Sequence, residues 1–372
     1  MVINNTSYTI PMVIEESSVV AACSSSAKFW SKRGGFRSSV VSTKKVGQVH
    51  FLWKGNSSRL EKLFSSEKEN LLKAVLPLAQ NMIKRGGGVK TIELKNLTSK
   101  MNNYYQLFLT FETCDAMGAN FINSVLEIIA SKWSECVKNA SAFSSTEREI
   151  QIIMSILSNY TPECLVYSEV CCPVNDLLDS KLNMSGKEFG ERMANAVKIA
   201  KVDPYRATTH NKGIFNGIDA VVLATGNDFR AIEACGHTFA ARDGSYRGLT
   251  DIDISEGEFK LSLRVPLSLG TVGGLTSLHP LAKFSLDLLG GPSASELMTI
   301  IGCVGLAQNF GALRSLVTTG IQKGHMKMHL LNILNRFEAT EKEREIVKKN
   351  FRGKTISFSG VQSFLNDLRK YH

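Results

Sequence analysis

Hydrophobic spacing along residues 46–157 predicts a compact domain of strands and helices. Four segments have the alternation or the short apolar runs of strands, and two intervening segments have the i, i+3, i+4 spacing of helices. The order is βαββαβ, the ferredoxin-like split arrangement, in a segment of ordinary domain size. The predicted strands are 46–53, 89–94, 104–111 and 150–157, and the predicted helices centre on 71–83 and 122–133.

Outside this domain the chain carries several signals for the start of a helix. Residues 16–18, Glu-Ser-Ser, precede a small apolar run and are typical of a helix start with a serine cap. Ser185 and Ser293 each begin a capping-box pattern, and the second opens a long helix. Residues 259–269 alternate as a strand, whereas residues 31–45 have the Ser, Gly, Arg and Lys content of a loop.

Residues 201–230 gather polar side chains around Gly213 and Gly217 and beside an apolar run at 218–225. The apolar run indicates that the segment is buried, and a buried polar group without a partner costs about 1–3 kcal/mol. We therefore expect Lys212 to be buried and either ion-paired or catalytic, with Asp228 within reach. The polar members are Arg206, Thr209, His210, Asn211, Lys212, Asn216 and Asp228.

Three further features allow both a functional and an ordinary structural interpretation. Glu16 stands where a strand meets a helix, a common place for an active-site residue, although a capping carboxylate is the commoner explanation. Residues 115–120, Asp-Ala-Met-Gly-Ala-Asn, begin a predicted helix whose free N–H groups suit a pyrophosphate, and Gly118 would allow a close approach. An ordinary aspartate cap remains the alternative, and no GxGxxG pattern is present. The glycine loop 270–274 either wraps a ligand or forms a tight turn.

The composition is that of a globular protein. The 372 residues are 43% hydrophobic and 21% charged, and the length suggests two or three domains. No apolar run has the length of a membrane span, and no secretion signal begins the chain, so we expect no membrane association. The eight cysteines lack metal-type spacing, which predicts free thiols, a cytoplasmic location and no bound metal.

The formal charge of +10 favours an anionic partner. Nucleic acid is disfavoured, because the basic residues are spread along the chain without a zinc-finger or an aromatic RNA-binding motif. A phosphorylated small molecule accounts for the charge equally well. A basic surface that is merely solvated is a third alternative.

Seven short motifs are spread over nearly the whole chain. They are Pro-Met-Val-Ile-Glu-Glu-Ser-Ser-Val-Val-Ala-Ala at 11–22, Asp-Ala-Met-Gly-Ala-Asn at 115–120, Asp-Pro-Tyr-Arg-Ala-Thr-Thr-His-Asn-Lys-Gly-Ile-Phe-Asn-Gly at 203–217, Ala-Thr-Gly-Asn-Asp at 224–228, Gly-Thr-Val-Gly-Gly at 270–274, Val-Gly-Leu-Ala-Gln-Asn at 304–309 and Gly-Ile-Gln-Lys-Gly-His-Met at 320–326. In content and order they resemble the motifs of the class II 3-hydroxy-3-methylglutaryl-coenzyme A (HMG-CoA) reductases.

This resemblance implies an α+β fold with three parts. Residues 1–42 and 158–320 would form a large domain of mixed helices and sheet that binds HMG-CoA. Residues 43–157 would be an inserted ferredoxin-like domain that binds NAD(P), and residues 321–372 a small, mobile helical flap. The family's active site lies between two subunits, so a homodimer or a trimer of dimers is expected.

The resemblance also implies the reaction: HMG-CoA is reduced by two NADPH to mevalonate and free coenzyme A (CoA), in the mevalonate pathway of isoprenoid biosynthesis. Lys212 would stabilise the oxyanion that forms at the thioester carbonyl. Glu16 would donate a proton at the aldehyde step, and Asp228 would lie against both residues in one hydrogen-bonded network. His325 would protonate the departing thiolate from the flap.

Binding residues follow from the same resemblance. The substrate contacts would be Ser18, Arg206, Thr209, Asn216 and Ala312, and the dinucleotide contacts would be Asp115, Met117, Gly118 and Asn120. The planar guanidinium of Arg206 suits the terminal carboxylate of the substrate. NADPH is expected, with NADH possible, because Ala79 stands where NADH-preferring members carry an aspartate, and Lys84 and Arg85 follow it.

Two differences from the family leave alternatives open. The chain begins almost at the Glu16 motif, without the longer N-terminal segment that helps members to form the dimer, and Ser17 replaces the usual proline. A truncated, inactive homologue is therefore one alternative. Because one site catalyses both directions, an NAD-dependent enzyme that converts mevalonate to HMG-CoA is another.

Overall fold

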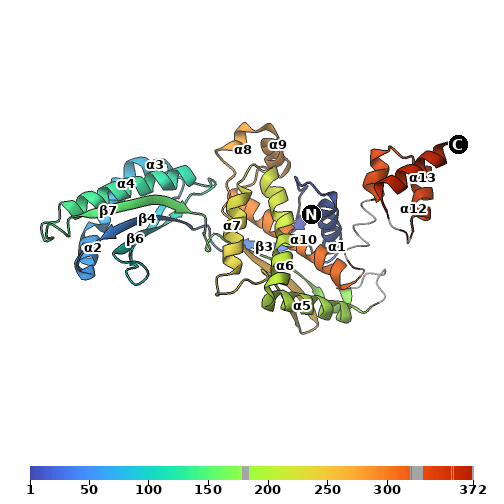
Figure 1. Ribbon diagram of the computed structural model, residues 1–372, viewed down its shortest axis with the longest axis horizontal. Helices are drawn as coiled ribbons and strands as arrows, with labels where there is room; N and C mark the ends of the chain where they lie inside the picture. The colour runs from blue at the N-terminus through green and yellow to red at the C-terminus, as the bar shows by residue number, and fades with distance from the viewer. Residues whose placement is uncertain (178–183, 319, 321–329, 353, 355, 371–372) are drawn as a thin grey trace.

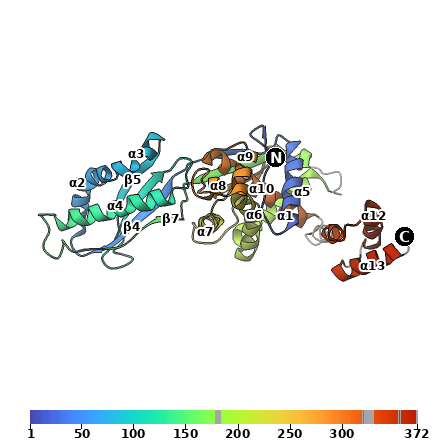
Figure 2. The same cartoon turned by 90° about the horizontal axis from the view of Figure 1, so that it is seen from above.

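The computed structural model describes residues 1–177, 184–318, 320, 330–352, 354 and 356–370. Their buried side chains form three separate hydrophobic cores, one in each of three regions along the chain. Two perpendicular views place the strand-rich small domain and the C-terminal helices at opposite ends of a larger central domain (Figure 1 and Figure 2). The expected α+β fold is confirmed.

The small domain has the predicted βαββαβ order. Its elements are β4 (Lys45–Trp53), α2 (Ser57–Ala74), α3 (Leu76–Lys84), β5 (Gly88–Asn96), β6 (Tyr104–Glu112), α4 (Ala119–Lys138) and β7 (Ile150–Ser158). The strands pair antiparallel in the order β5-β6-β4-β7. The first helical region is split into α2 and α3 at Val75, because Pro77 in the first turn of α3 has no backbone N–H to donate to the preceding turn.

The large domain packs helices on a second antiparallel sheet in the order β3-β8-β10-β9. Its elements are α1 (Ser17–Ser31), β3 (Arg37–Val40), β8 (Leu165–Pro173), the 3-10 helix η1 (Val174–Leu177), α5 (Gly186–Val202), α6 (Pro204–Ala224), α7 (Phe229–Ala240), β9 (Thr250–Ser255), β10 (Glu258–Pro266), α8 (Leu275–Leu278), α9 (Pro280–Leu288) and α10 (Ala294–Val317). A two-stranded ribbon of β1 (Val2–Ile3) and β2 (Thr6–Ser7) precedes them. The loop predicted for residues 31–45 was wrong in part, because β3 pairs there with β8.

The long helix α6 begins at a signal that also ends the helix before it. Asp203 is the C-cap of α5 and the N-cap of α6, and its side chain accepts a hydrogen bond from the N–H of Tyr205 at 3.0 Å. Pro204 occupies the first helical position, where the missing N–H costs nothing. Residues 201–230, whose secondary structure the sequence did not predict, are therefore mostly one helix.

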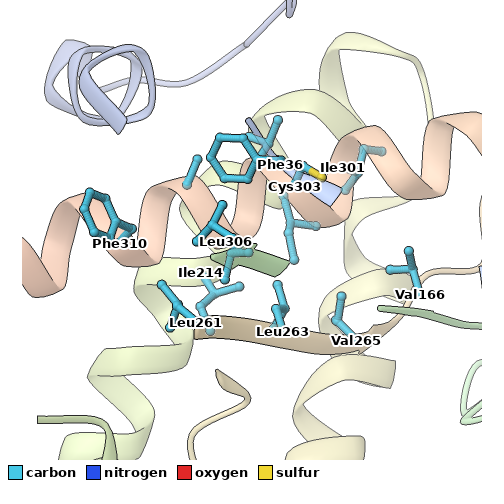
Figure 3. Packing of buried hydrophobic residues seen from close by; sticks show 14 of the residues in the cluster. Phe36, Val166, Ile214, Leu261, Leu263, Val265, Ile301, Cys303, Leu306 and Phe310 are labelled. Carbon is cyan, nitrogen blue, oxygen red and sulfur yellow. The ribbon is translucent and has the colours of Figure 1, made fainter. Parts of the chain in front are cut away.

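Helices α6 and α10 cross in close contact at two glycines. A Cβ on Gly217 would come within 2.9 Å of the Val304 carbonyl, and a Cβ on Gly305 within 2.8 Å of the Ile218 side chain. The helices run antiparallel, because His210 near the start of α6 contacts Asn309 near the end of α10. Figure 3 shows the core beneath this crossing, with Leu306 and Phe310 of α10 above Leu261 and Leu263 of β10.

Among the residues that the structure describes, α10 is the one helix that is long and apolar enough to cross a membrane. Of its most apolar window, 67% is buried inside the protein, which is the behaviour of a core helix. The capping box predicted at Ser293 is complete, with the side chains of Ser293 and Glu296 bonded to each other's backbone N–H groups.

The C-terminal helices α12 (Glu341–Asn350) and α13 (Phe358–Lys370) pack around a small core of their own. Helix α13 contributes Val361 and Leu365 to that core. The region is joined to the large domain where the Asn332 amide donates a hydrogen bond to Ser17 Oγ at 3.0 Å. The start of the C-terminal region therefore lies against the beginning of α1.

Candidate active site

Four of the predicted site residues lie on one face of α6. Arg206, Thr209, Lys212 and Asn216 follow one another at spacings of three, three and four residues, which places them on one stripe of a helix. The stripe lies opposite the buried face of the helix. Lys212 is exposed, so the expectation of a buried lysine was wrong. Burial along α6 follows the helical period, so a residue that is close to the apolar run in sequence can still face the solvent.

The buried polar groups of α6 are His210 and Asn211, and both are structural. His210 Nε2 lies 2.6 Å from Thr250 Oγ1, and the Asn309 amide nitrogen lies 3.2 Å from the same ring atom. Asn211 bonds the backbone carbonyl of Arg247 at 2.8 Å and the backbone N–H of Leu249 at 2.9 Å. Burial, with smaller contributions from nearby cations, lowers the pKa of His210 to about 3, so the ring is neutral. These two residues hold α6 in place.

Arg206 is half-buried at the start of the stripe. Burial lowers the pKa of its guanidinium, and no carboxylate among the described residues pairs with it. A half-buried cation without an anion is an unfavourable arrangement that a bound carboxylate would correct. Arg206 is thus placed to bind an anionic ligand.

Ala312 lies toward the same end of the large domain as Arg206, and α1 packs against α10 there. Ala312 follows Asn309 on α10 by about one turn, as Arg206 precedes His210 on α6, and the Asn309–His210 contact brings these two helix ends together. The preceding residue, Gly311, packs against α1, where an added Cβ would lie 3.0 Å from Ser26 Oγ. The first turn of α1 contains Ser18. The structure therefore brings Arg206 and Ala312 to one end of the α6–α10 pair and packs α1, which carries Ser18, against α10 there.

Glu16 is the N-cap residue of α1, but its side chain makes no capping hydrogen bond to the helix backbone. Its Oε1 instead accepts a 2.6 Å hydrogen bond from Ser18 Oγ. The segment before it is held along α6, since the Val13 N–H donates to the Ala220 carbonyl at 2.9 Å. The simple capping interpretation of Glu16 is therefore wrong, and its carboxylate is exposed next to Ser18.

Asp228 caps α7 and is paired with Arg230. Its Oδ1 accepts hydrogen bonds from the N–H groups of Arg230 and Ala231 at 3.1 and 3.3 Å, and Arg230 Nε lies 3.2 Å away. Burial acts to raise the pKa of Asp228, but the hydrogen bonds from Arg230 and Ala231 outweigh it and the pKa is lowered. Asp228 is therefore a carboxylate at neutral pH.

A single chain does not bring Lys212 and Asp228 together. The Asn227 N–H bonds the Val222 carbonyl at 2.9 Å, which fixes Asp228 near the end of α6. Lys212 precedes Val222 by ten residues, a separation of about 15 Å along a helix axis. Helical side chains also lean toward the N-terminus, so the ammonium points away from the carboxylate. The expected contact between the two residues is not formed within the chain.

The loop of residues 115–120 has the features of a ligand cradle. Gly118 is the N-cap of α4 in the left-handed conformation, with φ of 91°, and no described side chain caps this helix start. The ordinary capping role considered for Asp115 is wrong, because its Oδ1 instead accepts a 2.7 Å hydrogen bond from the N–H of Ala294 at the start of α10. The free N–H groups of α4 are thus left for a ligand.

The glycine loop 270–274 joins this cradle to Asp228. The Thr271 N–H donates to the Asp115 carbonyl at 2.8 Å, and a Cβ on Gly270 would lie 2.4 Å from the Met117 nitrogen. On its other side, the Gly270 N–H donates to Asn227 Oδ1 at 2.8 Å. Asn227 was not predicted as a site residue, although its place beside Asp228 in the 224–228 motif was a signal for it. Asp228 and the cradle therefore lie at one end of the large domain, and Arg206 lies at the other.

The predictions for His325, for a metal site and for the cysteines remain to be compared with the structure. His325 lies outside the described residues. Among the residues that are described, no group of three or more His, Cys, Asp or Glu side chains is placed to hold a metal ion. All eight cysteines are free thiols, as predicted.

Comparison with known proteins decides the family. A model of the hydroxymethylglutaryl-coenzyme A reductases matches residues 1–330. The chain belongs to this family. The 3-hydroxy-3-methylglutaryl-coenzyme A reductase of Archaeoglobus fulgidus is 35% identical over 371 residues, covering 99% of this chain and 80% of the relative.

Solved structures agree with this membership. The class II HMG-CoA reductase of Streptococcus pneumoniae, bound to NADPH in open conformations, is 39% identical with a TM-score of 0.77, over 85% of this chain and 82% of that chain. A second structure of the enzyme from S. pneumoniae is 37% identical with a TM-score of 0.78, over 99% and 85% of the two chains. The resemblance seen in the motifs, the fold and the expected oxidoreductase class are confirmed.

Proposed function

We propose that the chain reduces HMG-CoA to mevalonate and free CoA, with NADPH as the reductant. The observation that carries the proposal is the exposed stripe of α6, on which Arg206 and Lys212 have no acidic partner among the described residues. Two cations held ready on a rigid helix suit a substrate with a carboxylate and a carbonyl that becomes an oxyanion.

The cradle at residues 115–120 fits the dinucleotide. Gly118 lets the loop turn tightly over its floor, since a Cβ there would lie 2.4 Å from the Thr113 methyl group. The exposed residues Lys84 and Arg85 end α3 close to the cradle, because Cys114 Sγ contacts the Arg85 carbonyl at 3.2 Å. Because Ala79 is buried in α3, we assign the preference for the 2′-phosphate of NADPH to Lys84 and Arg85 and not to Ala79. When bound, the nicotinamide supplies hydride to the thioester carbon.

The chain's own residues would divide the remaining work. The Lys212 ammonium stabilises the oxyanion that forms at the thioester carbonyl, and Arg206 with Ser18 and Asn216 holds the substrate's acyl group. Glu16 donates a proton to the carbonyl oxygen of the aldehyde, and the Asp228 carboxylate pairs with Lys212. His325 protonates the departing thiolate.

The site is completed by a second subunit. Because about 15 Å of helix separates Lys212 from the residues around Asp228, a network that contains both needs Lys212 of one copy and Asp228 of another. An apolar stripe suited to such an interface is exposed on α9, where Leu281 is 69% and Phe284 is 62% exposed. Exposed patches of this kind mark interaction surfaces. We therefore propose a homodimer or a trimer of dimers.

The three hydrophobic cores support the domain division proposed from the resemblance, with residues 43–157 inserted between 1–42 and 158–320 and with 321–372 as the flap. Eight free thiols support a reducing, cytoplasmic location. The positive charge suits coenzyme A and NADPH, both of which are anionic.

Purified protein given HMG-CoA should oxidise NADPH at a higher kcat/KM than NADH. The loss of absorbance at 340 nm (a property of both reduced cofactors) measures each rate, and release of free thiol measures the coupled formation of CoA. Arg85→Ala should reduce the difference in kcat/KM between NADPH and NADH. Oxidation of neither cofactor, at concentrations where the protein is oligomeric, would overturn the proposal.

A further inference from the structure

A lysine lies fully buried beneath the cradle. Lys45, the first residue of β4, is 3% exposed, although lysine is among the residues that are least often buried. Burial lowers the pKa of its ammonium, and Glu112, Cys114 and Asp115 of the adjoining segment, with Cys164 at the base of β8, oppose that effect. Burying a cation is costly, so its retention requires a specific set of contacts.

These contacts are to the cradle itself. The Lys45 ammonium donates to Thr113 Oγ1 and, at 2.9 Å, to the Ala116 carbonyl. Thr113 Oγ1 donates in turn to the same carbonyl at 2.7 Å. The methyl group of Thr113 lies directly beneath Gly118. Lys45 and Thr113 thus form the floor on which the first turn of the cradle rests.

The opposite side of the cradle is held by the large domain. Asp115 receives hydrogen bonds from the N–H groups of Thr271 and Ala294, and Ala116 forms a bridge with Val272. These contacts come from backbone groups. On the small-domain side, the corresponding support comes from the side chains of Lys45 and Thr113, so their removal would free one side of the loop.

The charge of Lys45 has a second consequence. Two carboxyl groups lie at the loop proposed to bind an anionic dinucleotide: Glu112 precedes the loop and Asp115 is its first residue. The buried ammonium of Lys45 lies close to both carboxyl groups and offsets their negative charge. The low dielectric of the protein interior makes this effect stronger than it would be in water. A methionine of similar length would fill the same space without a desolvation cost, but it could neither donate to Thr113 and Ala116 nor offset the carboxyl groups.

We propose that Lys45 is a positioning residue that orders residues 115–120 for the dinucleotide and offsets the negative charge beside them. This role rests on the proposed function, because it assumes that NADPH binds at this loop. Lys45 does not touch the reacting atoms and acts through Thr113 and Ala116.

The test compares the full-length protein with Lys45→Met, Thr113→Val and the double variant. NADPH and CoA affinities are measured by fluorescence titration and calorimetry, and amide hydrogen exchange reports on residues 113–120. In Lys45→Met we expect the Kd and KM for NADPH to rise about tenfold, the effect of losing one charge-assisted hydrogen bond. The kcat at saturating NADPH and the Kd for CoA should stay within about twofold of wild type, and exchange of the loop amides should quicken.

The matched control is Lys44→Ala, which removes an equal charge one residue away, from a lysine that is exposed and paired with Glu163 at 2.7 Å. It should leave the NADPH Kd unchanged. Thr113→Val should reproduce the loss, and the double variant should add little to it. Equal rises in the constants for NADPH and CoA, or unchanged loop exchange and NADPH affinity, would overturn the role of Lys45. A wild-type protein that binds no NADPH would overturn the cofactor site itself, and this role with it.

Discussion

Lys212 is an exposed residue, and the role proposed for it is chemical and not structural. Since its side chain packs in no core, Lys212→Ala should leave the melting temperature and the NADPH affinity unchanged. Turnover should fall by at least about 10²–10³-fold, the usual effect of removing one oxyanion-stabilising donor. Lys198→Ala, at another exposed lysine, is the matched control and should retain full activity. Retained turnover in Lys212→Ala would remove Lys212 from the proposed mechanism.

His210 gives the large domain a dependence on pH. Its pKa is about 3 in the folded protein, while the unfolded chain binds the proton near the ordinary value of 6.5. Between these values the unfolded state holds more protons, so the free energy of unfolding falls as the pH falls from about 6.5 toward 3. Between pH 7 and pH 5 this residue should cost about 2 kcal/mol of stability.

Urea unfolding of the wild type and of His210→Gln at the two pH values measures that contribution. The glutamine retains a polar group near Thr250 but does not titrate, so the variant should lose about 2 kcal/mol less than the wild type over this interval. The same pH dependence in both proteins would show that other groups cause it.

At the scale of elements, regular hydrophobic spacing was a reliable guide. The small domain was predicted strand by strand, because its strands are short runs rich in apolar residues and its helices carry apolar faces that meet in one core. Helix α6 was not predicted, because Asp203-Pro204 can end one helix as readily as it begins another, and Gly213 and Gly217 lower the helix propensity of the sequence. Its buried face nevertheless repeats with the helical period, which was the signal to follow.

The two glycines of α6 have different purposes, and this leads to a paired prediction. A Cβ on Gly217 would meet the backbone of α10 at 2.9 Å, which cannot yield easily, so Gly217→Ala should destabilise the protein by about 1–3 kcal/mol. A Cβ on Gly213 would meet nothing within 4 Å, so Gly213→Ala should stabilise the helix by about 0.5–1 kcal/mol. Chemical unfolding measures both values. Equal effects would mean that the α6–α10 contact is looser than these distances indicate.

At the scale of the whole molecule, the sequence could name candidate site residues but could not place them. The motifs identified Lys212 and Asp228, and the helix that carries Lys212 then holds it away from Asp228 in the same chain. Spacing along a sequence carries no information on a contact that another subunit supplies. Lys45 was missed for a different reason, because a lysine at the start of an alternating strand has the pattern of a solvated residue.

A site shared between subunits predicts complementation between two inactive variants. Lys212→Ala and Asp228→Asn should each abolish turnover as pure proteins. If the two are unfolded together and refolded at equal concentrations, half of the dimers should be mixed, and each mixed dimer should contain one site with both residues intact. Recovery should therefore reach about a quarter of the wild-type activity in a two-fold dimer. Phe284→Lys on the exposed α9 stripe, added to both variants, should prevent recovery and give a monomer by light scattering. No recovery from dimers shown to be mixed would place Lys212 and Asp228 in the same subunit's site.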